Sequence, residues 1–418
     1  MRALYTLLWL LALPFMFVYL RWRGRRQPEY RTHWRERLGW GPALPDGPVI
    51  WLHTVSVGET RAAAPLMRAL RRRRPDATIL LSHTTPTGRA TARELFGADI
   101  PQTYLPYDLP GAVNRFLERG HPGIAIFLET EVWPNLYAAC AGRAIPTYLV
   151  NARLSEKSAR GYGRIAGLIR PALASLAGCA AQTEADAGRL AGLGAGTPLV
   201  TGNMKFDVTA PADTYTRAEE LRRRFAGRFV FVAASTRDGE EALLLDTCLG
   251  LDIADLLLVI VPRHPQRFDE VAALLESRGV EFARRSRGDT VTRETEVFLG
   301  DSMGELAAYY AAADAAFIGG SLLPLGGQNL IEAADMGCPV LIGPHTWNFL
   351  DATERAIAEG AALRVADAED LARALKRLHR DADKRHAMAE AGIHFSRAHK
   401  GATEKVMALL EPVLARLA

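Results

Sequence analysis

Hydrophobic residues are distributed in three ways along the chain. An uninterrupted run of 18 uncharged residues, Ala3–Leu20, comes first. Short apolar runs then alternate with longer segments of helical spacing, and the last part of the chain is helical in pattern throughout. Strands buried on both faces of a parallel sheet read as continuous apolar runs, and helices between them cover the sheet. The pattern therefore predicts an α/β protein.

The alternation of strands and helices occurs twice. A segment with Pro and small polar residues, 206–215, separates the two halves and predicts a linker. We expect a membrane anchor with a basic flank at 1–26, an α/β domain at 27–208, a linker at 209–225 and an α/β domain with terminal helices at 226–418. Both domains are expected to be Rossmann-like and to face each other across a cleft. The expected strands are 49–53, 77–83, 104–108, 123–129, 146–150, 176–181 and 197–202 in the first half, and 228–235, 256–262, 296–301, 315–320 and 339–343 in the second.

The N-terminal apolar run predicts a membrane anchor. Arg21, Arg23, Arg25 and Arg26 follow it directly, where a cleaved signal peptide needs small residues. Arginines remain on the cytoplasmic side and attract anionic headgroups. Because the run is slightly shorter than the ~20 residues of a straight span, a single span and an interfacial helix are both open. A buried core helix is the third alternative.

Charge is concentrated at the same end of the chain. Residues 1–40 contain eight arginines and two glutamates, a net charge of +6, whereas the whole chain has +4 and the other 378 residues therefore have −2. This distribution argues against a surface that coats nucleic acid. Even the run Arg71–Arg74 ends a predicted helix, where cations offset the helix dipole. The four cysteines form no C-x-x-C pair, which fits a reducing compartment.

Candidate chemistry in the first half lies where predicted strands end. HTVSVGET (53–60) opens a helix with Glu59, which can cap that helix or take a proton from a hydroxyl. Two carboxylates in FLETEVWPN (127–135) are costly to bury together unless they bind something. The candidate residues of this half are Ser56, Gly58, Glu59, Glu129, Glu131, Arg153 in NARLSEKS and Lys205 in GNMKFD, one of only six lysines in the chain.

The second half has cationic and glycine-rich strand ends. Glycines let backbone N–H groups approach a phosphate, and arginines supply charge-assisted donors, so the combination predicts a nucleotide site. Glu332, one turn into a predicted helix, suits a ribose diol. The candidates are Arg237, Arg263, His264, Met303, Gly304, Glu305, Ser321, Gly327, Gln328, Asn329 and Glu332.

Motifs for other chemistries are weak. GLGAG (192–196) precedes a strand instead of following one, which argues against a dinucleotide site, and the chain has neither a Walker motif nor a His-Glu-x-x-His zinc motif. We therefore expect no metal and no cofactor. The residues alone predict a membrane-attached nucleotide-sugar transferase. A hexosyltransferase with a UDP donor, a nucleotide-sugar epimerase and a non-catalytic membrane adaptor remain alternatives.

The ordered motifs resemble one enzyme family along almost the whole chain. YRTHWRERLGW (30–40), HTVSVGE, HTTPTGRATA (83–92), ETEVWPN, NARLSEKS, GNMKFD, the Arg-His-Pro segment and the Gly-rich stretch are similar to those of the 3-deoxy-D-manno-octulosonic acid (Kdo) transferases of lipopolysaccharide synthesis. These are glycosyltransferases of the two-domain B-type fold. The resemblance implies transfer of Kdo from CMP-Kdo to a sugar hydroxyl of a lipid A precursor, on the cytoplasmic face of the inner membrane.

The resemblance also implies residue roles. Glu59 would be the general base of an inverting reaction, the second half would bind CMP, and Lys205 and Arg153 would face the anionic donor and acceptor. Gln328 stands where the family's Gly-Gly-His-Asn motif has His, and its amide can donate a hydrogen bond but cannot become cationic. The sequence leaves open the number of Kdo units, the acyl pattern of the acceptor and the oligomeric state.

Overall fold

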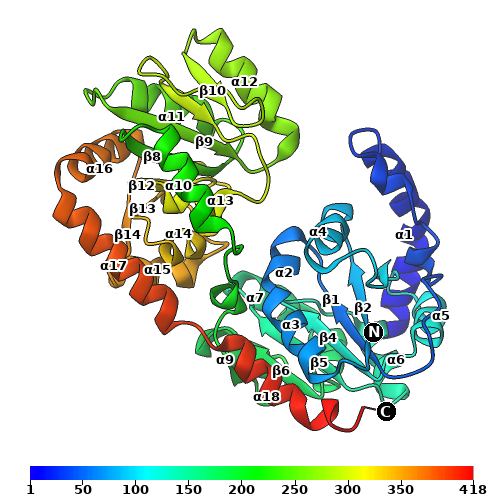
Figure 1. Ribbon diagram of the computed structural model, residues 1–418. Helices are drawn as coiled ribbons and strands as arrows, with labels where there is room; N and C mark the ends of the chain where they lie inside the picture. The colour runs from blue at the N-terminus through cyan, green and yellow to red at the C-terminus, as the bar shows by residue number, and fades with distance from the viewer. Residues whose placement is uncertain (418) are drawn as a thin grey trace. The chain divides into compact units, whose positions relative to one another are not determined.

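The computed structural model describes residues 1–417, which form two units. Unit 1 contains residues 1–208 together with the segment from Lys400 onward, and unit 2 contains Thr209–His399. Each unit is built on one sheet of seven parallel strands. The strands are drawn as arrows in Figure 1. The expected α/β class is therefore confirmed.

The sheet of unit 1 has the strand order β3-β2-β1-β4-β5-β6-β7. Its first strand lies in the interior of the sheet, so successive strands are added first on one side and then on the other. Ligands of such sheets bind at the carboxyl ends of the strands where this reversal occurs. The strands are β1 (Val49–His53), β2 (Thr78–His83), β3 (Gln102–Tyr104), β4 (Ile124–Leu128), β5 (Thr147–Ala152), β6 (Gly178–Ala181) and β7 (Leu199–Val200).

Both faces of this sheet are covered by helices, as the apolar strand sequences require. Trp51 of β1 packs on one face with Phe116 and Phe127, and Leu52 packs on the other face with Leu66 and Val406. The helices are α2 (Val57–Ala62), α3 (Ala64–Arg73), α4 (Pro86–Phe96), α5 (Pro110–Gly120), α6 (Pro134–Gly142), α7 (Glu156–Arg164), α8 (Ala166–Ala174) and α9 (Glu184–Gly192), with 3-10 turns η1 (Pro28–Arg31), η2 (Glu36–Leu38) and η3 (Met204–Asp207).

The last helix, α18 (Ala402–Leu414), also belongs to unit 1. The sequence assigned it to the second domain, and that boundary is wrong because its apolar side completes the core over α3. Asp207 accepts hydrogen bonds from the backbone N–H groups of Gly401 and Thr403, 2.7 and 2.6 Å away. Arg73 at the end of α3 forms an ion pair with Glu411. The arginine run thus helps to attach the C-terminal helix.

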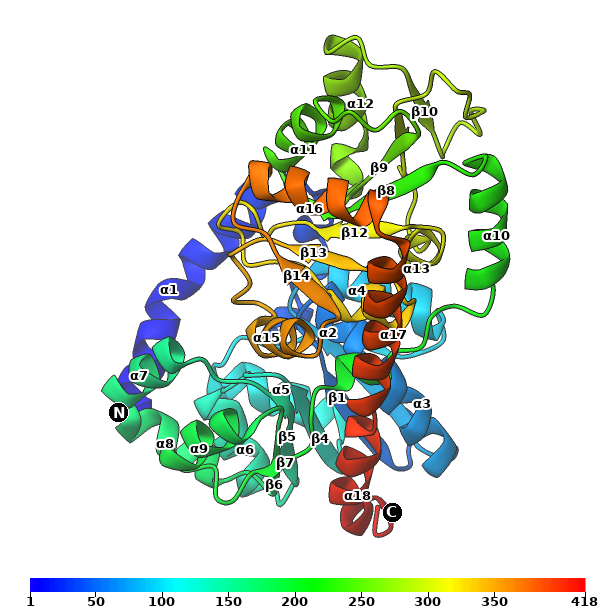
Figure 2. The ribbon, with the colours of Figure 1, turned by 90° about the vertical axis from the view of Figure 1, so that its left-hand side faces the viewer.

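The sheet of unit 2 has the order β10-β11-β9-β8-β12-β13-β14. Its first strand, β8, lies between β9 and β12 (Figure 2). Two of its short strands, β10 and β14, were not predicted. The strands are β8 (Phe229–Thr236), β9 (Leu256–Pro262), β10 (Phe282–Arg284), β11 (Val297–Leu299), β12 (Ala315–Ile318), β13 (Val340–Ile342) and β14 (Ala362–Arg364). The helices are α10 (Thr214–Arg224), α11 (Glu240–Leu249), α12 (Phe268–Ser277), α13 (Leu306–Ala311), α14 (Ile331–Asp335), α15 (Leu350–Ala358), α16 (Ala368–Arg380) and α17 (Ala382–Ala398), with the 3-10 turn η4 (Pro265–Arg267).

Most of the expected linker at 209–225 is helix α10, so that prediction was also wrong. Its sequence is strongly polar, yet Ala218 and Leu221 are buried. Arg222 forms a two-fold contact with Asp314, at 3.0 and 3.1 Å, which ties α10 to the start of β12. Tertiary contacts of a few apolar residues therefore make a helix from a segment whose composition resembles a linker.

The N-terminal apolar run forms α1 (Arg2–Arg23), a helix that is long and apolar enough to cross a membrane. One side of α1 contacts the rest of unit 1. The rings of Trp9 and Tyr107 are 5.6 Å apart, those of Phe17 and Trp34 are 5.3 Å apart, and Asn135 Nδ2 donates to Thr6 Oγ1 at 2.9 Å. The other side of the helix has exposed apolar side chains, namely Leu4, Leu7, Leu8, Leu10, Leu11, Phe15, Val18 and Trp22.

Candidate functional site

In unit 1, three candidate carboxylates lie at the carboxyl ends of the two central strands, β1 and β4. Glu59 is in the first turn of α2, directly after β1, whereas Glu129 and Glu131 follow β4. Since β1 and β4 are hydrogen-bonded neighbours, the fold brings these residues to one region. The structure therefore gathers Glu59 with two carboxylates that lie about 70 positions later in the sequence.

Glu59 is held by its own helix start. Its Oε2 accepts from the backbone N–H of Val55 at 2.8 Å, Ser56 Oγ donates to Oε1 at 3.2 Å, and the Glu59 N–H donates back to Ser56 Oγ. This arrangement is a variant of the capping box, in which the Glu59 carboxylate accepts from the N–H of Val55, one residue before the N-cap Ser56. Gly58, another candidate of this segment, has no crowded neighbour that would require glycine.

The environment of Glu59 favours a bound proton. Burial is the largest cause, the charge of Glu129 is the next, and together with Glu131 they raise the pKa of Glu59 to about 8 despite the hydrogen bonds from Val55 and Ser56. A carboxyl group with such a pKa can accept a proton near neutral pH and bind it more tightly than an ordinary glutamate.

Glu129 is paired with Lys205, which comes from η3 near the end of unit 1's first segment. The distance from Lys205 Nζ to Glu129 Oε1 is 2.9 Å. The backbone of Glu129 has a φ of 58°, in the left-handed region that non-glycine residues adopt at a cost. Such backbone strain is typical of functional sites. The turn that bears Lys205 is itself fixed by Asn151, whose Oδ1 accepts from the Met204 N–H at 2.9 Å.

Glu131 is contacted by groups that the sequence did not single out. Trp133 Nε1 donates to Glu131 Oε2 at 2.8 Å, and the ring nitrogen Nε2 of His53 lies 3.7 Å from the same oxygen. His53 is fully buried. Its place at the end of β1, six residues before Glu59, was the available signal. The backbone carbonyl of Arg153 accepts from Thr130 Oγ1, so the Arg153 loop is tied to the β4 loop.

A pocket of about 190 Å³ lies between α1 and these loops. It is mainly apolar, and its lining includes Trp9 and Leu20 of α1, Trp133 beside Glu131 and Thr85, whose hydroxyl donates to the carbonyl of Val55. The pocket therefore adjoins the segments that hold both Glu59 and Glu131.

In unit 2, cationic candidates gather at the ends of β8 and β9. Arg237 follows β8, and Arg263 and His264 follow β9, its hydrogen-bonded neighbour. Burial lowers the pKa of His264, and the positive charges of Arg237, Arg263 and Arg267 lower it further. The shift shows that positive potential is concentrated at this end of the sheet, as an anion site requires.

The glycine-rich segment reaches the same place. Arg263 Nε donates to Gln328 Oε1 at 3.3 Å, which joins the loops that follow β9 and β12. Gly319 passes so close to β8 that a Cβ would lie 2.5 Å from the carbonyl oxygen of Ser235, and Gly327 has a φ of 72°. Only glycine fits these two positions without strain.

The other candidates in this segment are used inside the loop. Ser321 is fully buried; its hydroxyl donates to the carbonyl of Ile318 and accepts from the N–H of Gly343. Asn329 Oδ1 accepts from the Ile331 N–H at 3.1 Å, directly before α14, which carries Glu332 in its first turn. These contacts shape the loop.

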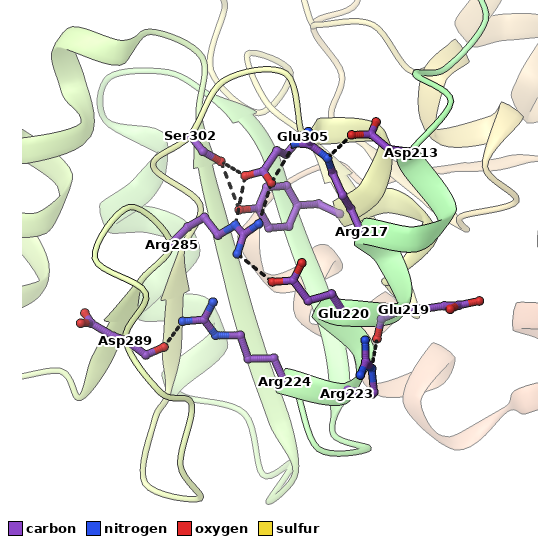
Figure 3. Close-up of polar contacts among 11 residues, drawn as sticks. Asp213, Arg217, Glu219, Glu220, Arg223, Arg224, Arg285, Asp289, Ser302 and Glu305 are labelled. Atoms are coloured by element: carbon purple, nitrogen blue, oxygen red, sulfur yellow. Dashed lines mark hydrogen bonds and ion pairs between the residues drawn. The ribbon is translucent and has the colours of Figure 1, made fainter.

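Glu305 is the centre of an ion-pair network (Figure 3). Its carboxylate is 2.7 Å from Arg285 Nη2 and 3.2 Å from Arg217 Nη1, and Ser302 Oγ donates to it. The hydrogen bond from Arg285 is the main cause of its lowered pKa. The carboxylate thus joins α10, the turn after β10 and α13. Met303 and Gly304, just before it, are exposed.

Within residues 1–417, no group of three or more His, Cys, Asp or Glu side chains is arranged to hold a metal ion. The four cysteines are buried and none of them forms a disulfide. Burial raises the pKa of Cys140 to about 11 and that of Cys179 to about 12, so neither thiol is activated as a nucleophile.

Comparison with known proteins gives consistent matches. Residues 32–208 match the family model described as 3-deoxy-D-manno-octulosonic-acid transferase (kdotransferase). The chain is 43% identical to the 3-deoxy-D-manno-octulosonic acid transferase of Bordetella pertussis, over 98% of this chain and 99% of that protein. It is 36% identical to the enzyme of the same name from Haemophilus influenzae, over 99% of both chains.

Solved structures of other proteins are similar to the chain in fold. The co-structure of S. aureus MnaA with UDP resembles the chain with a TM-score of 0.61 and 15% identity, over 88% of this chain and 97% of that one. UDP-GlcNAc 2-epimerase from Neisseria meningitidis gives a TM-score of 0.59 and 14% identity, over 87% and 100%. At these identities the likeness concerns the fold alone.

Proposed function

The chain belongs to the Kdo transferase family, and we propose that it transfers Kdo from CMP-Kdo to a sugar hydroxyl of a lipid A precursor, with Glu59 as the general base. The observation that carries the proposal is the environment of Glu59, a carboxyl group at the end of β1 whose pKa is raised to about 8. Kdo is assigned as the transferred sugar because the similar proteins of Bordetella pertussis and Haemophilus influenzae are Kdo transferases by name.

In the proposed reaction, Glu59 takes the proton of the acceptor hydroxyl while the hydroxyl oxygen attacks the anomeric carbon of Kdo. The bond from that carbon to the phosphate oxygen of CMP breaks, CMP leaves as an anion, and the anomeric centre is inverted. A base that binds its proton with a pKa near 8 is well matched to this step, because general-base catalysis is efficient when the pKa is close to the working pH. Removal of the proton contributes about 100- to 10,000-fold to the rate.

The donor is assigned to unit 2. Arg237 and Arg263 offer charged donors to the CMP phosphate, and these fixed charges stabilise it as it leaves. Gln328 is already hydrogen-bonded to Arg263 and serves to orient that guanidinium. This assignment does not require a protonated group at position 328, where the family motif has His.

The acceptor is assigned to unit 1. Lys205 and Arg153 lie near the acidic cluster and would attract the anionic groups of a lipid A precursor, while the pocket beneath α1 offers apolar surface. The exposed apolar side of α1 and the arginines that follow it support attachment to a membrane that contains anionic lipids. We assign the protein to the cytoplasmic face of the inner membrane on this basis.

Two measurements on the purified full chain test the proposal. Incubation with CMP-Kdo and a tetra-acylated lipid A precursor should yield products heavier by one or more Kdo units in mass spectrometry, and unchanged acceptor would contradict it. CMP should raise the melting temperature, whereas UDP should not. Protection by UDP alone would favour a hexosyltransferase or an epimerase; a solved UDP-GlcNAc 2-epimerase is similar in fold.

A further inference from the structure

A buried histidine lies behind the acidic cluster of unit 1. His53 is the last residue of β1 and has no exposed surface. Its Nδ1 is 2.7 Å from Ser82 Oγ on the neighbouring strand β2, and its Nε2 is 3.7 Å from Glu131 Oε2. Nε2 makes no hydrogen bond with any described residue. The ring therefore connects a hydroxyl on one side with a carboxylate on the other.

Ser82 decides which ring nitrogen of a neutral His53 carries the proton. The Ser82 hydroxyl accepts a hydrogen bond from Trp51 Nε1, a group that can only donate, at 2.7 Å. Among the described residues, the hydrogen of that hydroxyl then has one acceptor within reach, Nδ1 of His53. A hydroxyl that accepted from both rings would leave its own hydrogen buried and unpaired, which is unfavourable.

With Nδ1 as acceptor, the proton of the neutral imidazole is on Nε2. This N–H faces Glu131, whose Oε2 already accepts from Trp133 Nε1. The distance of 3.7 Å is longer than a hydrogen bond, but contacts of this kind often tighten only when substrate binds. Trp133 Nε1 thus donates to Glu131 Oε2, and His53 Nε2 lies 3.7 Å from the same oxygen, where an N–H can help to position this carboxylate.

The position of Glu131 matters because of what else is nearby. Its charge and that of Glu129 act on Glu59, and Glu129 in turn is paired with Lys205. His83, at the end of β2, is the other ionisable group beside His53; its Nδ1 contacts Thr54 and no carboxylate. Among these groups, Glu131 is the one that His53 faces directly.

We propose that His53 is a positioning residue: Trp51 and Ser82 hold it in the Nε2–H form, and its N–H orients the Glu131 carboxylate next to Glu59. This inference rests on the proposed function for the role of Glu59, whereas the protonated nitrogen of His53 follows from the geometry alone. Nothing in the sequence motif distinguishes this role from that of an ordinary buried histidine.

The ring form can be observed directly. Nitrogen-15 NMR of the full chain in detergent, with labelled histidine, distinguishes Nε2–H from Nδ1–H by the shifts of the two ring nitrogens, and His53→Gln identifies the signal by its loss. We expect the Nε2–H form, and Ser82→Ala should change the ring shifts. A neutral His53 protonated at Nδ1 would overturn the proposal, whatever the result for Glu59.

The coupling to Glu131 is tested by the pH dependence of kcat/KM. The His53→Phe variant keeps a ring but has no N–H to offset the negative charge of Glu131. That charge should therefore raise the pKa of Glu59 further, and the rising part of the pH profile should move to higher pH by about 0.5–1 unit. In His53→Gln the rising part of the profile should lie close to its wild-type pH, because the glutamine amide can place an N–H near the position of Nε2. In a Glu131→Gln background, His53→Phe should cause no further shift.

A matched control distinguishes loss of the His53 N–H from a general effect of changing a buried histidine. His83→Gln changes another buried histidine at a strand end and should leave the rising part of the profile in place, with folding of every variant checked by thermal unfolding. Equal shifts in His83→Gln and His53→Phe, or a His53→Phe shift that persists without Glu131, would overturn the proposal. If Glu59→Gln keeps normal turnover, the base assignment fails, but the NMR result still decides the form of His53.

Discussion

Lys205 Nζ lies 2.9 Å from Glu129 Oε1, an ion pair between η3 and the end of β4. The pair joins residues 76 positions apart and fixes a carboxylate whose backbone is in the left-handed region. Because Glu129 is the largest charged influence on Glu59, this contact sets part of the electrostatic environment of the proposed base.

Replacement of Glu59 by glutamine should remove the base and keep the shape of the side chain. We expect turnover to fall by at least about 100-fold, as for a lost general base, with little change in the affinity for CMP. Steady-state kinetics and calorimetric titration with CMP measure the two quantities. Glu94→Gln, an exposed change on α4, is the control. Near-normal turnover in Glu59→Gln would exclude Glu59 from the mechanism.

The pH profile should report the charge of Glu129. In the wild type, kcat/KM should rise with pH through a pKa of about 8, since Glu59 must lose its proton to act as a base. Glu129→Gln removes a negative charge that raises the pKa of Glu59 and leaves the charge of Lys205, so the rising limb should move to lower pH. A limb that stays in place, or moves upward, would contradict the assignment.

Arg263→Ala should weaken CMP binding about 10- to 100-fold, the usual effect of losing a charge-assisted hydrogen bond. It should also free Gln328, which now accepts from the Arg263 guanidinium. Arg373→Ala removes an exposed arginine on α16 and serves as the control. Unchanged affinity in Arg263→Ala, measured by calorimetry, would move the nucleotide site elsewhere.

Membrane attachment should depend on the exposed side of α1. The triple change Leu7→Ser, Leu11→Ser and Phe15→Ser leaves the contacts of α1 with the rest of unit 1 intact. It should lower partition into anionic vesicles by at least about 100-fold, because three apolar side chains lose their burial in lipid.

Sedimentation with vesicles measures that partition. Leu199→Ser, Leu249→Ser and Leu350→Ser alter three exposed leucines outside α1 and should leave it unchanged. Equal losses in both triple variants would assign membrane binding to general surface hydrophobicity.

Asp207→Ala should loosen the C-terminal helix from unit 1. The carboxylate accepts from the N–H groups of Gly401 and Thr403 at the start of α18, and loss of a cap of this kind lowers the melting temperature by about 2–8 °C. Asp213→Ala breaks an exposed ion pair with Arg217 and should change it far less. Differential scanning calorimetry compares the two, and similar melting temperatures would contradict the capping role.

Local patterns predicted most of the candidate site. Glu59, Glu129, Arg237 and Arg263 each follow an apolar run, and parallel strands bring their carboxyl ends to one edge of a sheet. Local patterns could not show that the Ser321 hydroxyl accepts from the N–H of Gly343 or that the Glu305 carboxylate is shared by Arg285 and Arg217. Those partners lie far away in sequence, so side-chain orientation depended on contacts that only folding creates.

The sequence by itself determined the α/β class, the two parallel sheets and the apolar N-terminal helix, because each depends on the periodicity of neighbouring residues. Tertiary structure alone decided that α18 completes unit 1, that 214–224 is helix instead of linker, and that His53 faces Glu131. These outcomes depend on packing and polar contacts between residues that are far apart in the sequence. Local sequence patterns do not show which of these long-range contacts form.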